Sequence, residues 1–145
     1  MRTLVVLLFA STAVANIPKD NLSKIADKIL KETKHNKNID TSLIIAFAKV
    51  ESSFDANASG DGGKAYGLYQ FHKDRWLECG GTEKNWKNAD VEIQTKIMIT
   101  ALNKYCKSNK KEVDYIRWMA TSHNIGHGID KETDYVKKVR KANKK

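Results

Sequence analysis

Apolar residues along most of the chain repeat at spacings of three and four positions, the pattern of amphipathic helices. The pattern predicts about six helices, over residues 21–34, 40–53, 71–78, 90–106, 111–123 and from 130 onward. Between residues 55 and 63 this periodicity is lost, and the glycines there indicate a loop or a short hairpin. We therefore expect a mainly α fold, with helices around a central buried helix and a small irregular or β lobe.

The segment 40–53 is predicted to be the central helix. Asp40 is a suitable N-cap, and the apolar residues after it cover nearly the whole circumference of the helix, which is typical of a buried helix. Glu51 is the only acidic residue of this helix after Asp40, and it lies near the end. A carboxylate in such a place costs free energy unless it is paired, protonated or functional. Its position leaves two interpretations open: a capping or ion-paired glutamate, or a general acid.

The second interpretation, a general acid, would suit a glycosidase. Burial raises the pKa of a carboxyl group, and a glutamic acid that stays protonated near neutral pH can protonate a glycosidic oxygen. Many glycosidases use a second carboxylate at the sugar carbon that becomes positively charged. Asp61, in the glycine-rich loop, could take part by orienting a water, and it is otherwise a turn residue of the sequence 59–63.

Residues 1–15 have the features of a secretory signal peptide. They contain Arg2, a short apolar run and the Ala13–Ala15 cleavage pattern. We expect residues 16–145 to form one mature domain that is secreted, either extracellular or periplasmic. No later apolar stretch is long enough to span a bilayer, so we expect no stable membrane insertion. We also expect a monomer.

Charge and cysteines narrow the function classes further. In an oxidising compartment Cys79 and Cys106 are expected to form a disulfide. Thiols and histidines lack the spacing of a metal site, so we expect no metal and no cofactor. The net charge of +9 favours attraction to the polyanions of bacterial walls. The lysines are spread along the chain and are not clustered with aromatic residues, so we expect no nucleic-acid partner.

Short motifs occur in a defined order along the chain: Glu51–Phe54, Ser59, Gly67–Gln70, Asn124–Gly126 and Glu132–Val136. In this order they resemble the motifs of soluble lytic transglycosylases, a family related to goose-type lysozymes. The resemblance covers residues 22–139, essentially the whole predicted mature domain. It implies an α+β lysozyme-like fold that cleaves the β-1,4 bond between N-acetylmuramic acid and N-acetylglucosamine in peptidoglycan.

The resemblance also implies roles for individual residues. Glu51 would be the single catalytic acid and later the base, and the substrate's own N-acetyl or 6-hydroxyl group would replace a second carboxylate, so that a 1,6-anhydro product forms. The predicted substrate-binding residues are Ser59, Tyr66, Gln70, Asn124 and Tyr135, with the hydroxyl of Tyr135 directed toward Glu51. Three of them have alternative interpretations: Gln70 as a loop-stabilising amide, Asn124 as a helix C-cap and Tyr135 as a core residue.

The chain departs from the family's pattern at several positions, among them Tyr69, His123 and Ile125, and its final motif is one residue shorter between Glu132 and Tyr135. The family usually has methionine where Tyr69 stands, and tyrosine where His123 stands. Tyr69 would make the pocket floor more polar or offer a ring to a sugar, whereas His123 is a structural histidine or one that perturbs the site. The tryptophans Trp76, Trp86 and Trp118 are candidates for sugar stacking, and we expect at most one of them in the cleft.

The sequence thus predicts a secreted peptidoglycan glycosidase with glycan strands as its partner. The predicted activity is that of a lytic transglycosylase, and a goose-type-like lysozyme with an antibacterial role is the alternative. A non-catalytic cell-wall-binding module is the alternative of another class.

Overall fold

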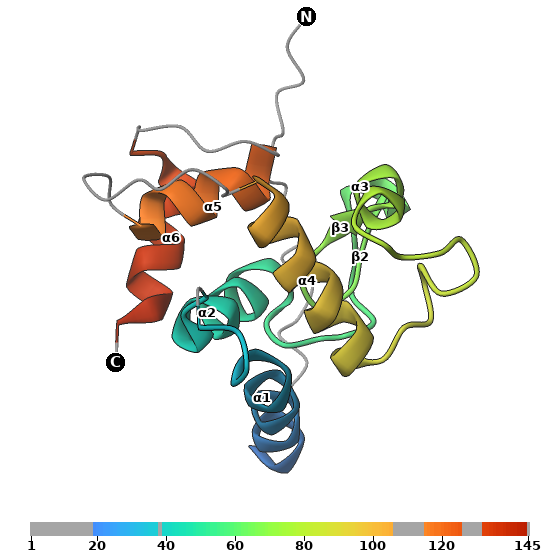
Figure 1. Cartoon of the computed structure of the whole chain (residues 1–145), viewed down its shortest axis with the longest axis horizontal. Helices are drawn as coiled ribbons and strands as arrows, with labels where there is room; N and C mark the ends of the chain where they lie inside the picture. Colours follow the sequence, from blue (N-terminus) through green and yellow to red (C-terminus); the bar gives the residue numbers. More distant parts are fainter. Residues whose placement is uncertain (1–18, 38, 106–114, 126–131, 145) are drawn as a thin grey trace, which may run out of the picture.

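The computed structural model describes residues 19–37, 39–105, 115–125 and 132–144. Within them the chain is mainly helical with a small three-stranded sheet, as predicted (Figure 1). The helices are α1 (Lys19–Thr33), α2 (Thr41–Ser52), α3 (Lys73–Glu78), α4 (Val91–Tyr105), α5 (Tyr115–Ile125) and α6 (Asp134–Asn143). The strands are β1 (Ser59–Gly60), β2 (Ala65–Tyr66) and β3 (Phe71–His72), with a 3₁₀ turn, η1 (Asp61–Gly63), between β1 and β2.

Helix α2 begins and ends where its residues dictate. The Asp40 side chain accepts a hydrogen bond from the backbone N–H of Ser42 at 2.9 Å, which confirms the predicted N-cap. The helix ends because Ser53 and Phe54 both adopt left-handed backbone conformations, with φ of 51° and 66°. This ending places Glu51 in the last turn of α2, where the chain turns toward the small sheet.

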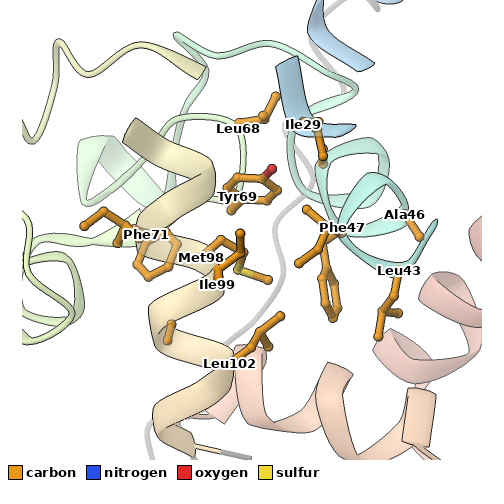
Figure 2. Close-up of a cluster of buried hydrophobic side chains, with 14 of the residues drawn as sticks. Ile29, Leu43, Ala46, Phe47, Leu68, Tyr69, Phe71, Met98, Ile99 and Leu102 are labelled. Atoms are coloured by element: carbon orange, nitrogen blue, oxygen red, sulfur yellow. The ribbon is translucent and has the colours of Figure 1, made fainter. Parts of the chain in front are cut away.

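Helix α2 is the centre of the hydrophobic core, as its sequence predicted. Leu43, Ile44 and Phe47 are fully buried, and α2 packs against α1 and α6. Figure 2 shows Leu43 and Phe47 of this helix across from Met98 and Leu102 of α4. Because α2 is held on several sides, the carboxylate in its last turn has a fixed position in the molecule.

The small sheet gives structure to the segment without periodicity. The strand order is β1–β2–β3, and both pairs are antiparallel, with Ser59 opposite Tyr66 and Tyr66 opposite Phe71. The predicted helix 71–78 is therefore wrong at its start, because Phe71–His72 pairs as β3 and α3 begins only at Lys73. Burial of the Phe71 ring against the core holds these two residues in the sheet.

Gln94 of α4 is hydrogen-bonded to the loop between β2 and β3. Its side-chain oxygen accepts from the backbone N–H of Leu68 at 2.6 Å, and its nitrogen donates to the carbonyls of Ala56 and Ala89. Gly67, with φ of 89°, passes so close that a Cβ there would lie 2.4 Å from the same Gln94 oxygen. One buried amide thus satisfies three backbone groups of neighbouring segments.

Several other predictions fall on these elements. Cys79 is a free, buried thiol, and its predicted partner Cys106 lies outside the described residues, so the disulfide is not found in the described part of the chain. Burial raises the pKa of the Cys79 thiol. No helix within the described ranges is long and apolar enough to cross a bilayer.

Tyr69 and the tryptophans also have defined places. Tyr69 is buried with its hydroxyl 2.8 Å from that of Thr95, so it belongs to the core and offers no ring to a sugar. Trp76 is buried, and its indole N–H donates to Asn85. Trp86 is half-buried, with the Lys87 ammonium 4.7 Å from its ring centroid. The side chain of Trp118 is outside the described part.

Candidate active site

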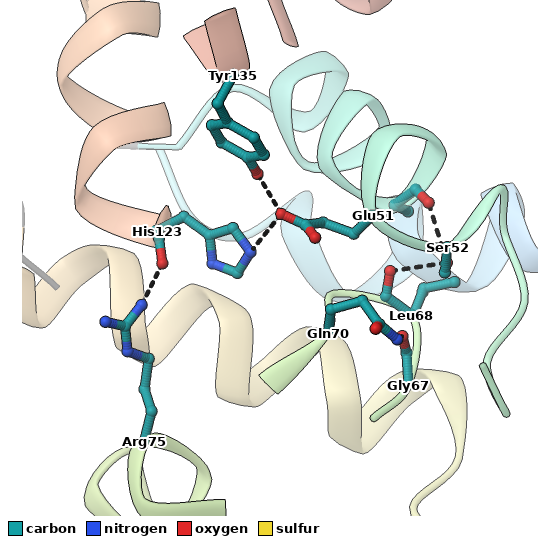
Figure 3. A network of polar contacts seen from close by, with 9 residues as sticks. Glu51, Ser52, Gly67, Leu68, Gln70, Arg75, His123 and Tyr135 are labelled. Carbon is teal, nitrogen blue, oxygen red and sulfur yellow. Dashed lines mark hydrogen bonds and ion pairs between the residues drawn. The ribbon is translucent and has the colours of Figure 1, made fainter. Parts of the chain in front are cut away.

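Glu51 is the centre of a buried polar network built by three helices. Its side chain is 9% exposed, and one carboxylate oxygen, Oε1, receives both of its contacts (Figure 3). The Tyr135 hydroxyl of α6 donates to Oε1 at 2.5 Å, and His123 Nε2 of α5 lies 3.4 Å from it. No described residue bonds the other oxygen, Oε2, and Figure 3 shows it turned away from both partners.

Tyr135 occupies the first turn of α6, where Thr133 caps the helix by accepting from the backbone N–H of Val136. Its ring is buried, and burial together with the nearby Glu51 carboxylate raises the pKa of Tyr135 well above the ordinary value of a tyrosine. The phenol therefore stays neutral and acts as a donor. This is the contact that the sequence resemblance implied.

His123 is held firmly beside Glu51. Its ring centroid lies 5.2 Å from that of Phe47 and 5.8 Å from that of Phe71. The Arg75 guanidinium of α3 donates to the backbone carbonyl of His123. The second ring nitrogen, Nδ1, is buried and has no hydrogen-bond partner among the described residues. From the sequence, His123 was expected to be a structural histidine or one that perturbs the site, and its contact with Glu51 was not predicted. His123 lies at i+3 from Ala120 and i+7 from Ile116, the spacing of the inward face of α5.

Hydrogen bonds of Ser52 and Gln70 stabilise the loop between β2 and β3, residues 67–70, next to the end of α2. Ser52 directly follows Glu51 in α2, and its hydroxyl donates to the Leu68 carbonyl at 2.8 Å. Gln70 has a left-handed backbone, with φ of 52°, and its side-chain nitrogen donates to the carbonyls of Ala58 and Gly67. The Gln70 amide therefore stabilises the loop, which was its alternative interpretation, while its partial exposure leaves it at the molecular surface.

The remaining predicted residues lie on the small sheet and on α5. Ser59 is exposed on β1, and Tyr66 is half-buried on β2 with its hydroxyl 3.2 Å from Asn57 Oδ1. Asn124 is partly exposed in the last turn of α5, directly after His123. Asp61 is exposed in η1, and its Oδ2 lies 3.1 Å from His72 Nε2.

The arrangement is suited to proton transfer by one carboxyl group. Glu51 has one oxygen engaged by protein donors and one without a described partner, which is the disposition of a general acid or base. No group of three or more histidine, cysteine, aspartate or glutamate side chains that could hold a metal ion occurs within the described ranges.

The match to a family of known proteins makes this chain a lysozyme-like domain. A comparison with protein families matches residues 20–142 to the phage tail lysozyme family, and the chain belongs to that family. Membership of a lysozyme family implies a glycosidase that cleaves peptidoglycan. No curated protein and no solved structure matches the chain. The more specific likeness to soluble lytic transglycosylases and goose-type lysozymes stays a prediction.

Proposed function

We propose that the protein is a secreted lytic transglycosylase that cleaves the β-1,4 bond between N-acetylmuramic acid and N-acetylglucosamine, with Glu51 as acid and then base. The observation that carries this proposal is the isolation of the carboxyl group. Within the described residues, the hydrogen bond and the ion-pair contact of the Glu51 carboxyl group are with Tyr135 and His123, and neither partner is a carboxylate. A glycosidase site with one carboxylate needs another group to complete the reaction.

In the proposed reaction, protonated Glu51 gives its proton to the glycosidic oxygen as the bond from that oxygen to C1 of the muramic acid breaks. The 6-hydroxyl oxygen of the same sugar then forms a bond to C1, and the Glu51 carboxylate takes the proton from that hydroxyl. The products are an N-acetylglucosamine end with a free hydroxyl and a 1,6-anhydro sugar. Glu51 returns to its protonated form, and no other reactant is consumed.

Hydrolysis is the second candidate, and Asp61 is the residue that would support it. A water oriented by a second carboxylate would attack C1 in place of the 6-hydroxyl. Asp61, however, is exposed and paired with His72. This pairing supports a structural role for Asp61 in the turn and favours the transglycosylase.

A non-catalytic wall-binding module is the candidate of another class. Such a module needs no buried acid, whereas this chain buries Glu51 with two polar partners at a cost in desolvation. Secretion, and attraction of the basic chain to anionic wall polymers, complete the proposal.

The products of wall digestion test the proposal. Purified peptidoglycan is incubated with the protein, and the released sugars are measured by mass spectrometry. Fragments with 1,6-anhydro ends are expected. Reducing ends in their place would establish hydrolysis, and the absence of released fragments would favour the binding module.

A further inference from the structure

The two partners of Glu51 both contact the same oxygen. The Tyr135 hydroxyl lies 2.5 Å and His123 Nε2 lies 3.4 Å from Oε1. A carboxylate oxygen has two lone pairs, so two donors fill its capacity. A proton on the carboxyl group then has its place on Oε2, which no described residue contacts.

The surroundings of His123 determine which of its ring nitrogens can act as a donor. In a neutral imidazole one nitrogen donates and the other accepts. Nδ1 is buried and no described residue bonds to it, so a proton there would leave a buried donor without an acceptor in the described part of the chain. A proton on Nε2, by contrast, has the Glu51 oxygen as its acceptor.

Within the described residues, the polar contact of the ring is with Glu51 alone. The ring is 5% exposed, it lies against Phe47 and Phe71, and the Arg75 bond to the His123 carbonyl fixes the backbone. Among the described residues, the ionisable groups in contact with it or with its Glu51 partner oxygen are Glu51 of α2, Tyr135 of α6 and, at its carbonyl, Arg75 of α3. The contact with Glu51 is therefore the feature of the His123 ring that bears on the chemistry.

We infer that His123 is a positioning residue: its neutral ring donates from Nε2 to Glu51 Oε1 and, together with Tyr135, directs the acid proton of Glu51 to Oε2. Oε2 is then the atom that gives the proton to the glycosidic oxygen and later takes one back. This inference rests on the proposed function, since it specifies which oxygen of Glu51 carries out that chemistry.

Two variants separate positioning from packing. His123→Phe keeps a ring between Phe47 and Phe71 and removes the donor, together with the unpartnered Nδ1, so its Tm is expected to match or exceed that of the wild type. Its kcat on peptidoglycan should fall about ten- to a hundredfold, the effect of one hydrogen bond to a charged group, while KM changes little. His123→Gln retains an N–H donor and should recover part of the lost kcat.

If His123 served packing alone, kcat would change in parallel with Tm in both variants, and His123→Phe with an unchanged Tm would keep its kcat. Wild-type kcat and an unchanged pH–rate profile in His123→Phe would overturn the inference. Glu51→Gln is measured in parallel. If it keeps full activity, the proposed function fails; if it is inactive beside a fully active His123→Phe, only the role of His123 fails.

The proton on the ring can be observed without any assay. Two-bond ¹H–¹⁵N NMR spectra of the wild-type protein distinguish the tautomers of a histidine. The neutral tautomer with its proton on Nε2 is expected for His123. A proton on Nδ1, alone or together with one on Nε2, would overturn the inference even if the variants fail to fold.

Discussion

The Tyr135 hydroxyl donates a 2.5 Å hydrogen bond to Glu51 Oε1 across 84 positions of sequence. The bond joins the last turn of α2 to the first turn of α6, two helices that pack against each other in the core. The position of the carboxylate therefore depends on the packing of helices from both ends of the domain.

Tyr135→Phe should reduce activity with a smaller effect on the fold. Loss of a hydrogen bond to a charged group corresponds to about 1.5–3 kcal/mol, or roughly a ten- to hundredfold fall in kcat. Tyr69→Phe is the matched control, because its buried hydroxyl bonds Thr95 and not Glu51. Steady-state rates of wall digestion compare the two, and equal losses in both would contradict a specific role for Tyr135.

Asp61→Asn should leave the rate of cleavage and the anhydro product nearly unchanged. Asp61 is exposed and its contact with His72 is at the surface, so the change is expected to cost at most about 1 kcal/mol of stability. Rate and product ends are both measured. A large loss of rate with intact folding would make Asp61 a second catalytic carboxylate and would favour hydrolysis.

Gln94→Leu should destabilise the domain strongly. It leaves the Leu68 N–H and the carbonyls of Ala56 and Ala89 without their partner, and each unsatisfied buried group costs about 1–3 kcal/mol. Urea unfolding measures the change. Thr100→Ala, on the exposed side of the same helix, is the control and should change stability by less than about 0.5 kcal/mol. Similar values for both variants would contradict the role of Gln94.

Gly67→Ala should be more costly than Gly62→Ala, although both glycines have positive φ. A left-handed backbone costs a residue with a side chain about 1–2 kcal/mol at either position. At Gly67 the new Cβ would also lie 2.4 Å from Gln94 Oε1, whereas at Gly62 it would meet no atom within 4 Å. The difference in free energy of unfolding isolates the steric contact, and equal losses would contradict it.

Stability should also fall at alkaline pH through Tyr69 and Tyr135. The pKa of each is raised in the folded protein, chiefly by burial. Their contribution is therefore fully present below the pKa of an unfolded tyrosine and is lost as the pH rises through the folded value. Thermal unfolding across this range measures the loss. It should be smaller in Tyr135→Phe, and an unchanged pH dependence in that variant would contradict the assignment.

The sequence was most informative where one residue pattern determines one element. The apolar circumference of 41–52 and the cap at Asp40 suffice to predict a buried helix that ends near Glu51. The strand at Phe71–His72 could not be predicted in this way, because two residues show no periodicity and their pairing with β2 is a tertiary contact.

The site could be predicted only in part, for the same reason. The nearness of Tyr135 to Glu51 followed from the family resemblance. The contact of His123 with Glu51 did not, since it depends on how α5 packs against Phe47 and Phe71. Gln70 illustrates a different difficulty: its side chain is engaged by the loop that carries it, and the amide residue type does not distinguish this from sugar binding.

The most direct test of the proposed role of Glu51 is the release of soluble fragments from purified peptidoglycan by Glu51→Gln. Glu83→Gln is its control, because Glu83 is an exposed glutamate whose only described ion pair is with Lys73. With Glu51 as the acid, Glu51→Gln should remain folded and release almost no fragments, while Glu83→Gln releases them at the wild-type rate. Fragment release by Glu51→Gln at the wild-type rate would contradict that role.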